Sequence, residues 1–205
     1  MEILNKTLVL VVVMSIQFIN AHDQKTIQEA FSKSYTLETN KKYTEAIDAF
    51  KVVNSVENYP VQLRLGWLNY QAKKYSESIV AYKKASDLMP ASVEALLGMV
   101  NPLVAQTKWG DLEQVYLNIL KIDAKNSLVN FRLGQIYYNR KEYSKAATYF
   151  STSLNLYPFD YDSMLMSGWN YYFLGKYSEA KELFQRVLLY SPTDASAKEG
   201  LGLIK

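Results

Sequence analysis

The side chains that usually perform catalysis or bind metals are scarce in this chain of 205 residues. It contains no cysteine and one histidine, which excludes thiolate nucleophiles, disulfides, cysteine-based zinc sites and imidazole-rich metal sites. It also has no glycine-rich phosphate loop and no paired-carboxylate motif. The chemistry that remains is that of aromatic and charged surfaces, which bind other molecules. The sequence therefore predicts a protein that is not an enzyme and that needs no cofactor or metal.

The composition favours a folded domain. Hydrophobic residues make up 49% of the chain and aromatic residues 14%, while charged residues reach only 21%. This content is high enough to build a packed core. The net charge is +3, and the lysine pairs at 41–42, 73–74 and 83–84 are spread along the chain, as solvated faces are. A nucleic-acid partner is not predicted, because it normally requires a clustered basic face.

Residues 1–21 are predicted to be a secretory signal peptide. An apolar run from Thr7 to Ile19 is followed by a polar segment, and the pattern places the cut after Ala21. The run is shorter than the roughly 20 apolar residues that a membrane-spanning helix needs. Because Ile19 is large for its place before the cut, an uncleaved membrane anchor stays open as the alternative. We expect an exported protein, periplasmic or secreted, with residues 22–26 as a linker and membrane contact only if the signal is uncleaved.

The elements that follow must be helices stacked in a regular array. Aromatic residues recur at a spacing of 34 residues, shortened to 32 in the first interval, at Tyr43, Tyr75, Trp109, Tyr143 and Tyr177. A period of this length is typical of repeated helical units. A second aromatic row lies seven residues further on, at Phe50, Tyr82, Tyr116, Phe150 and Phe184. This spacing predicts one buried face on each helix. A second helical stretch before each anchor contains Gly66, Gly134 or Gly168, which lets the paired helix approach closely.

This pattern resembles the tetratricopeptide repeat, a helix-turn-helix unit of 34 residues. The matching positions include the three glycines, the small residues Ala46, Ala146 and Ala180 of the second helix, and the stop residues Pro90, Pro158 and Pro192. The resemblance implies an all-α, right-handed superhelical solenoid over residues 27–205. Its expected parts are repeats at about 27–58, 59–92, 93–126, 127–160 and 161–194, and a C-terminal helix at 195–205.

Two places depart from the family pattern. The first repeat has Ser34 in place of the glycine and loses two residues of spacing, so it is the least regular. In the third repeat, Asn101 and Pro102 fall inside the expected first helix. Proline lacks an N–H and crowds the preceding turn, so we expect a kink or a break there. A tolerated bend and a hinge are both compatible with the sequence.

The resemblance also implies which residues line a concave groove. In the family, the first helix of each repeat faces that groove, so the equivalent residues here form a candidate site for a protein or peptide partner. They are Tyr35, Arg64, Trp67, Tyr70, Asn101, Phe131, Arg132, Gln135, Tyr138, Trp169 and Tyr172. The tryptophans offer large rigid contact surfaces with one N–H donor each. Tyrosines at the position of Tyr70 are often packing residues in the family.

Several alternatives stay open at this point. Some family members clamp a terminal carboxylate with asparagines, but Tyr35 and Trp67 stand where those residues are needed, so such a clamp is not predicted. Arg64 and Arg132 either pair with an acidic group of the partner or lie solvated on the rim. The C-terminal helix ends with Leu201, Leu203 and Ile204, which suggests a second function, a scaffold that assembles with copies of itself.

Overall fold

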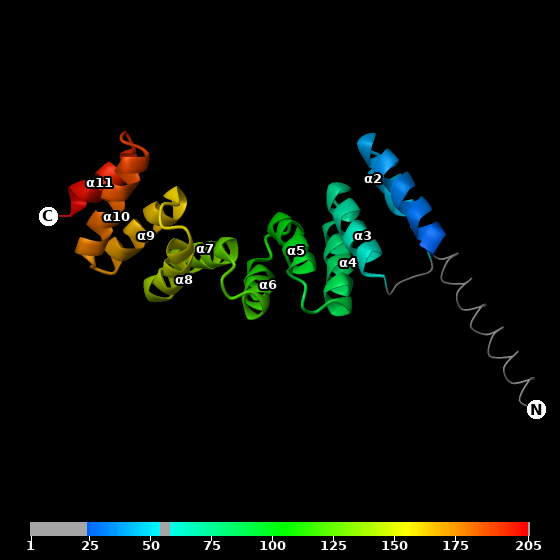
Figure 1. Cartoon of the computed structure of the whole chain (residues 1–205), viewed down its shortest axis with the longest axis horizontal. Coiled ribbons are helices and arrows are strands. Elements are labelled where there is room, and N and C mark those ends of the chain that lie inside the picture. Colours follow the sequence, from blue (N-terminus) through cyan, green and yellow to red (C-terminus); the bar gives the residue numbers. More distant parts are fainter. Residues whose placement is uncertain (1–23, 54–57, 205) are drawn as a thin grey trace, which may run out of the picture. The chain divides into compact units, whose positions relative to one another are not determined.

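The computed structural model describes residues 24–53 and 58–204, and within these ranges every regular element is a helix (Figure 1). The first helix covers residues 24–39. The others are α2 (Tyr43–Asp48), α3 (Tyr59–Gln71), α4 (Tyr75–Leu88), α5 (Val93–Ala105), α6 (Trp109–Ile122), α7 (Ser127–Asn139), α8 (Tyr143–Leu156), α9 (Tyr161–Phe173), α10 (Tyr177–Tyr190) and α11 (Ala195–Leu203). The expected all-helical repeat fold is confirmed.

The N-terminal segment lies largely outside this description. The candidate signal peptide at 1–21 is not among the described residues, whereas residues 24–26 of the expected linker already belong to the first helix. None of the described helices has the length and apolar character that crossing a membrane requires.

The first helix of each later repeat begins at a polar capping residue. The side chains of these caps accept a hydrogen bond from a backbone N–H in the first helical turn, which satisfies a group that the helix itself cannot. The caps are Asn58, Ser92, Asn126, Asp160 and Asp194, and they also recur every 34 residues. The repeat period therefore sets the helix starts as well as the apolar faces.

The second aromatic row is buried, as its spacing predicts. Phe184 is fully buried, and Tyr82 is 6% exposed. Each of these rings packs against two glycines. A Cβ on Gly66 or Gly98 would lie 2.7 or 2.3 Å from the Tyr82 ring, and one on Gly200 would lie 2.3 Å from the Phe184 ring. These distances are shorter than carbon atoms tolerate, so glycine is required where neighbouring helices close on the ring.

The structure agrees with the sequence at the irregular first repeat but differs from the expectation at the third. In the first repeat the second helix, α2, has only 6 residues, in agreement with the lost spacing. In the third repeat α5 continues through Pro102, so the expected break is absent. Pro102 lies near the C-terminal end of α5 and is fully buried. Packing of the ring offsets the loss of one helical hydrogen bond.

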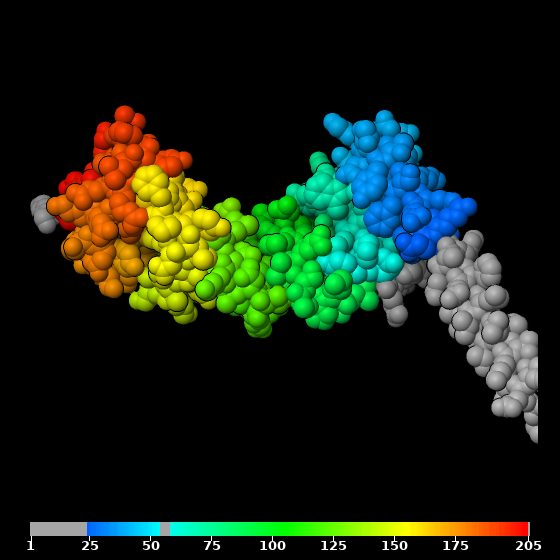
Figure 2. Space-filling view, in the orientation of Figure 1, coloured from blue at the N-terminus to red at the C-terminus, as the bar shows by residue number. Residues whose placement is uncertain are grey.

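The chain divides into two compact units, and the boundary in the sequence falls between Lys108 and Trp109. Unit 1 contains the first helix and α2 to α5, and unit 2 contains α6 to α11 (Figure 2). In unit 1, α4 packs against both α3 and α5, and α3 also contacts α5. In unit 2, α7 contacts α9, α9 contacts α11, and α8 and α10 pack against them. The first helices of successive repeats thus form one shared face within each unit, and this face carries the candidate site.

Candidate functional site

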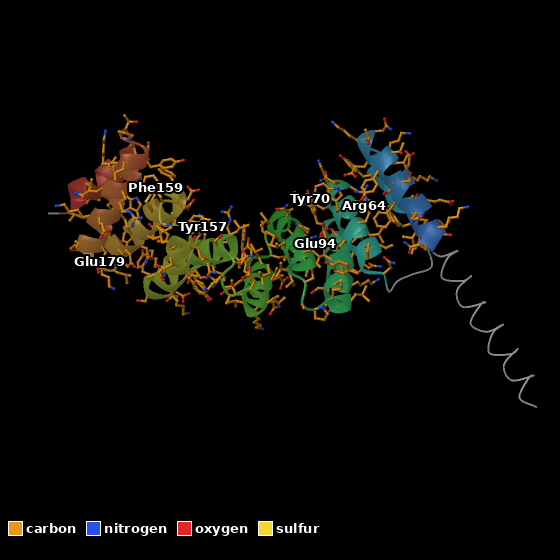
Figure 3. All side chains as sticks on the ribbon, in the orientation of Figure 1. Arg64, Tyr70, Glu94, Tyr157, Phe159 and Glu179 are labelled. Atoms are coloured by element: carbon orange, nitrogen blue, oxygen red, sulfur yellow. The ribbon has the colours of Figure 1, made fainter. Side chains whose placement is uncertain are left out.

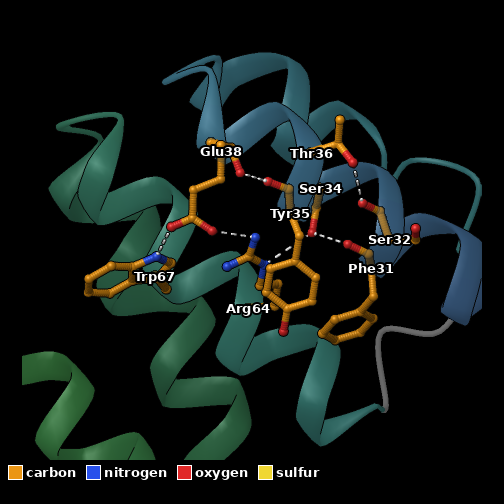
Figure 4. Close-up of polar contacts among 9 residues, drawn as sticks. Phe31, Ser32, Ser34, Tyr35, Thr36, Glu38, Arg64 and Trp67 are labelled. Atoms are coloured by element: carbon orange, nitrogen blue, oxygen red, sulfur yellow. Dashed lines mark hydrogen bonds and ion pairs between the residues drawn. The ribbon is translucent and has the colours of Figure 1, made fainter.

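Arg64 lies in a polar network that joins the first helix to α3 in unit 1 (Figure 4). Its guanidinium Nη2 is 2.6 Å from Glu38 Oε2, and its Nε donates to Ser34 Oγ at 3.1 Å. The guanidinium carbon also lies 4.0 Å from the centre of the Tyr35 ring, which is cation–π geometry. The Arg64 side chain is only 8% exposed. A charge buried to this extent needs its partners, and the network supplies them.

Glu38 is the centre of this network, because each of its two carboxylate oxygens has a partner. Trp67 Nε1 donates to Oε1 at 2.6 Å, while Arg64 faces Oε2. Burial raises the pKa of Glu38, whereas the hydrogen bonds from Trp67 and Arg64 lower it. The lowering effects together are larger, so the pKa lies below its ordinary value of 4.5. Glu38 is therefore ionised at neutral pH. It fixes the orientation of the Trp67 indole, of which 40% stays exposed.

This geometry corrects the expectation for Arg64. It is not a solvated rim residue, and its charge is already neutralised within the chain by Glu38. An acidic partner would have to displace a buried ion pair in order to reach it. Arg64 acts here as a positioning residue that holds Tyr35 and Glu38 in place.

A cavity of about 350 Å³ opens beside this network on the shared face of unit 1. Four of its nine lining residues are aromatic, and its one acidic group is Glu94, at the start of α5. The lining residues are Phe31, Tyr35, Pro60, Leu63, Arg64, Trp67, Tyr82, Glu94 and Gly98. Figure 3 labels Arg64 and Glu94 on the neighbouring helices α3 and α5. The structure thus brings Tyr35, Arg64 and Trp67 of the expected site together around one hollow.

Tyr70 and the two tyrosines at the same repeat position pack against the second helix of their own repeat, and Tyr138 also lies 6.0 Å from the ring of Phe173 in the next repeat. The ring of Tyr70 lies 6.0 Å from that of Tyr75, at the start of the next helix. Tyr138 and Tyr143, and likewise Tyr172 and Tyr177, have ring centres 5.6 Å apart. All three tyrosines are half-buried, which fits the packing role that the sequence left open. Asn101, on α5, is exposed.

Arg132 in unit 2 has a different environment from Arg64, although both occupy the sixth position of their repeats. Arg132 is exposed, and its Nη1 donates to Gln135 Oε1 at 2.9 Å. Its guanidinium carbon is 5.9 Å from the centre of the Phe131 ring. These three expected residues line a cavity of about 420 Å³ that also contains Asp160 and Asp162. Unlike Arg64, Arg132 stays accessible to a partner.

Trp169 connects three helices of unit 2. Its Nε1 donates to Ser196 Oγ on α11 at 2.8 Å, and its ring lies 5.2 Å from the Phe184 ring on α10. The ring of Tyr172 stands almost perpendicular to it at 5.7 Å. Trp169 is half-buried as a result. It presents less free surface than Trp67 does.

The sequence analysis did not single out the residues that position these indoles. Glu38 in unit 1 and Ser196 in unit 2 both come from helices of neighbouring repeats. Glu38 stands at the twelfth position of its repeat, where Tyr70, Tyr138 and Tyr172 stand in others. The acidic residue at a position where other repeats have tyrosine is the sequence feature that could have revealed Glu38.

Unit 2 also exposes aromatic side chains at the loops that join its repeats. Tyr157 is 59% exposed, Phe159 51% and Tyr190 58%, and the Phe159 and Tyr190 rings lie 5.8 Å apart. Figure 3 labels Tyr157 and Phe159 on this edge. These loop residues offer a second aromatic surface, which the repeat pattern did not predict.

The end of the C-terminal helix is mostly covered within unit 2. Leu201 and Ile204 pack against the cluster of buried residues that contains Phe184 and Ala197. Leu203 is 49% exposed. Two of the three apolar residues that suggested self-assembly are therefore used inside the unit.

Comparison with known proteins assigns the repeats. Models of the tetratricopeptide repeat match residues 127–160 and 162–194, which correspond to the pairs α7–α8 and α9–α10. The chain contains tetratricopeptide repeats. Its helices outside these two repeats follow the same period, with helix starts at Tyr59, Val93 and Ala195. No curated protein matches the chain in sequence.

Solved structures of other tetratricopeptide repeat proteins have the same fold. One from Parabacteroides merdae has a TM-score of 0.70 and 18% identity, over 86% of this chain and 71% of its own. MamA from Desulfovibrio magneticus has a TM-score of 0.65 and 13% identity, over 83% of this chain and 97% of its own. PilF from Pseudomonas aeruginosa has a TM-score of 0.53 and 21% identity, over 70% of this chain and 65% of its own. At these identities the likeness concerns the fold.

Proposed function

We propose that this tetratricopeptide repeat protein is a non-catalytic adaptor that holds a protein or peptide partner on the faces that the first helices of its repeats form within each unit. The observation that carries the proposal is the exposed indole of Trp67 beside an aromatic cavity, held in place by the Glu38 carboxylate. Exposed, rigid aromatic side chains next to a pocket are typical of the residues that dominate protein interfaces. Tetratricopeptide repeat proteins are in general scaffolds for protein interaction.

The proposed place of action is outside the cytoplasm, in a bacterial envelope or a secretory compartment. The apolar run from Thr7 to Ile19 supports it, followed as it is by Ala21 and a polar segment. The absence of cysteine makes the fold independent of the redox state of that compartment. Sequencing the N-terminus of the protein purified from its own cells tests this part. A chain that begins at His22 supports export, and an intact N-terminus in the cytoplasmic fraction contradicts it.

Partner capture from an extract of the native organism tests the adaptor function. The double variant Trp67→Ala, Trp169→Ala is expected to lose a stoichiometric partner, since each such residue contributes about 2 kcal/mol when it is central to an interface. Trp109→Ala is the matched control, because Trp109 is also exposed, at 54%, but begins α6, a second helix of its repeat. Unchanged capture by the double variant, with its helical content intact, would show that this face is not the site.

A further inference from the structure

The unit 1 cavity is better suited to a cationic group than to an acidic one. Its aromatic walls include Tyr35 and Trp67, and its one uncompensated charge is the carboxylate of Glu94. The only other charged side chain in the lining is Arg64, which Glu38 neutralises at 2.6 Å. The net charge around the cavity is therefore negative, although its lining contains an arginine.

Glu94 is available to an incoming group. It is exposed, and it forms none of the ion pairs found among the described residues. Its Oε2 accepts a hydrogen bond from the Tyr59 hydroxyl at 3.0 Å, which orients the carboxylate without cancelling its charge. A carboxylate held in this way can accept further charge-assisted hydrogen bonds.

The aromatic side chains add a second preference for a cation. Tyr35 and Trp67 are 54% and 40% exposed, so ring surface is free to meet a ligand. Tyr35 already stacks with the guanidinium of Arg64 on one side. A cation over an aromatic face is attracted by the negative face of the ring, and more strongly when it is desolvated. Leu63 in the lining accommodates the aliphatic stem of a long side chain.

We infer that the unit 1 cavity receives a basic side chain, arginine or lysine, of the partner polypeptide. The charged head meets the Glu94 carboxylate and the aromatic walls, and the stem lies along Leu63. The inference deepens the proposed function and rests on it. It also reverses the preference that the arginine in this groove suggested, because Arg64 is satisfied by Glu38.

Nuclear magnetic resonance of the ¹⁵N-labelled chain tests this inference. The reporter is the indole N–H signal of Trp67, assigned by its loss in Trp67→Phe. The probes are N-acetylarginine amide, its uncharged isostere N-acetylcitrulline amide and N-acetylglutamate amide. We expect the arginine probe to shift the Trp67 signal saturably, with a dissociation constant about tenfold below that of the citrulline probe. The glutamate probe should cause the smallest shift.

Glu94→Gln is the decisive variant, because it removes the charge while keeping an acceptor for the Tyr59 hydroxyl. It should bring the arginine and citrulline dissociation constants to within about twofold. Asp162→Asn, at the unit 2 cavity, is the control and should leave the preference intact. A preference that survives Glu94→Gln, equal binding of the two probes, preferred binding of the glutamate probe or no saturable shift with the arginine probe would each overturn the inference. Partner capture that still depends on Trp67 and Trp169 would then show that the adaptor function stands without it.

Discussion

Two arginines and two tryptophans occupy the same repeat positions in the two units, yet their surroundings differ. In unit 1, Arg64 is buried against Glu38, and the same carboxylate holds the exposed Trp67. In unit 2, Arg132 is exposed and contacts the neutral Gln135, while Trp169 is half-buried against Phe184. The backbone position within the repeat is shared, but the environment of each side chain is not.

The difference arises from the neighbouring helices. Glu38, on the first helix of the preceding repeat, sets the charge balance around Arg64 and Trp67. Ser196 lies on α11, in the repeat after that of α9, and it orients Trp169. A repeat motif therefore determines where a side chain is placed, and the adjacent repeat determines whether it is free to bind. In unit 1 the tryptophan is held by Glu38 and lines an open cavity, whereas in unit 2 the tryptophan is more closely packed.

Removal of the Glu38 carboxylate should have the largest effect on this contrast. Glu38→Ala leaves the cation of Arg64 buried without its counter-charge, and we expect a loss of about 3 kcal/mol in the free energy of unfolding. Arg132→Ala in unit 2 should change it by less than about 0.5 kcal/mol, because that side chain is exposed. Urea unfolding followed by circular dichroism measures both. Similar losses in the two variants would mean that the two arginines are equivalent after all.

Substitution of the glycines that contact the buried aromatic row should have the next largest effect on stability. Gly200→Ala places a Cβ 2.3 Å from the fully buried Phe184, and we expect it to cost about 2 kcal/mol. Gly98→Ala makes the same test at Tyr82 in unit 1. Gly202→Ala is the control, since it lies on the same helix as Gly200 with open space around it, and it should stabilise slightly. Thermal unfolding ranks the three, and a neutral Gly200→Ala would contradict the close contact.

The turns between paired helices are alike in the two units, and substitutions there should have smaller effects. The residue two positions before each of these second helices has a positive φ, which is 60° at Lys73 in unit 1 and 62° at Lys141 in unit 2. Gly175 provides the same conformation, at 73°, without a side chain. Because a side chain is strained there, Lys73→Gly and Lys141→Gly should each raise the free energy of unfolding by about 1 kcal/mol. Gly175→Lys should lower it by a similar amount. Destabilisation by Lys73→Gly or Lys141→Gly would show that the lysine backbone is not strained at these turns.

Acid should have the smallest of these effects on the Glu38 network, because a carboxyl group with a lowered pKa stays partly ionised as the pH falls towards 3. The folded-state pKa of Glu38 lies below its value in the unfolded chain, so its contribution is complete at neutral pH. The contribution is lost as the pH falls below the ordinary value of 4.5 and through the folded-state pKa.

Unfolding of the wild type and of Glu38→Gln, followed from pH 7 towards pH 3, measures this loss. The difference between the two should shrink as the pH falls. Glu113→Gln gives the comparison in unit 2, where the hydrogen bond from Arg140 lowers the pKa of Glu113. A constant difference between wild type and Glu38→Gln across this range would show that Glu38 is not paired in solution.

Much of the fold follows from the period of the sequence. The rows that begin at Tyr43 and Phe50 placed the second helices and their buried rings, and glycines such as Gly66 marked the closest approach. A proline at the end of a helix, such as Pro102, is tolerated when its ring is buried, which a rule about helix interiors does not anticipate. The period also contains the capping residues, although aromatic patterning alone does not reveal them.

The site was less predictable, because its chemistry depends on contacts between repeats. The positions of Trp67 and Arg64 on the shared face follow from the repeat register. The pairing of Arg64 with Glu38 depends on how the first helix packs on α3, and the exposed loop aromatics such as Phe159 depend on where each repeat turns into the next. Sequence spacing within one repeat contains neither kind of information.

Site-specific photocrosslinking in the native organism tests the central claim most directly. A benzophenone amino acid is placed at Tyr35 or Tyr172, on the face of the first helices, and in parallel at Phe159 or Leu189, which are exposed outside that face. The account predicts one discrete protein adduct from the first pair of positions and little from the second. Adducts that form only at Phe159 and Leu189 would place the partner outside the face of the first helices and contradict it.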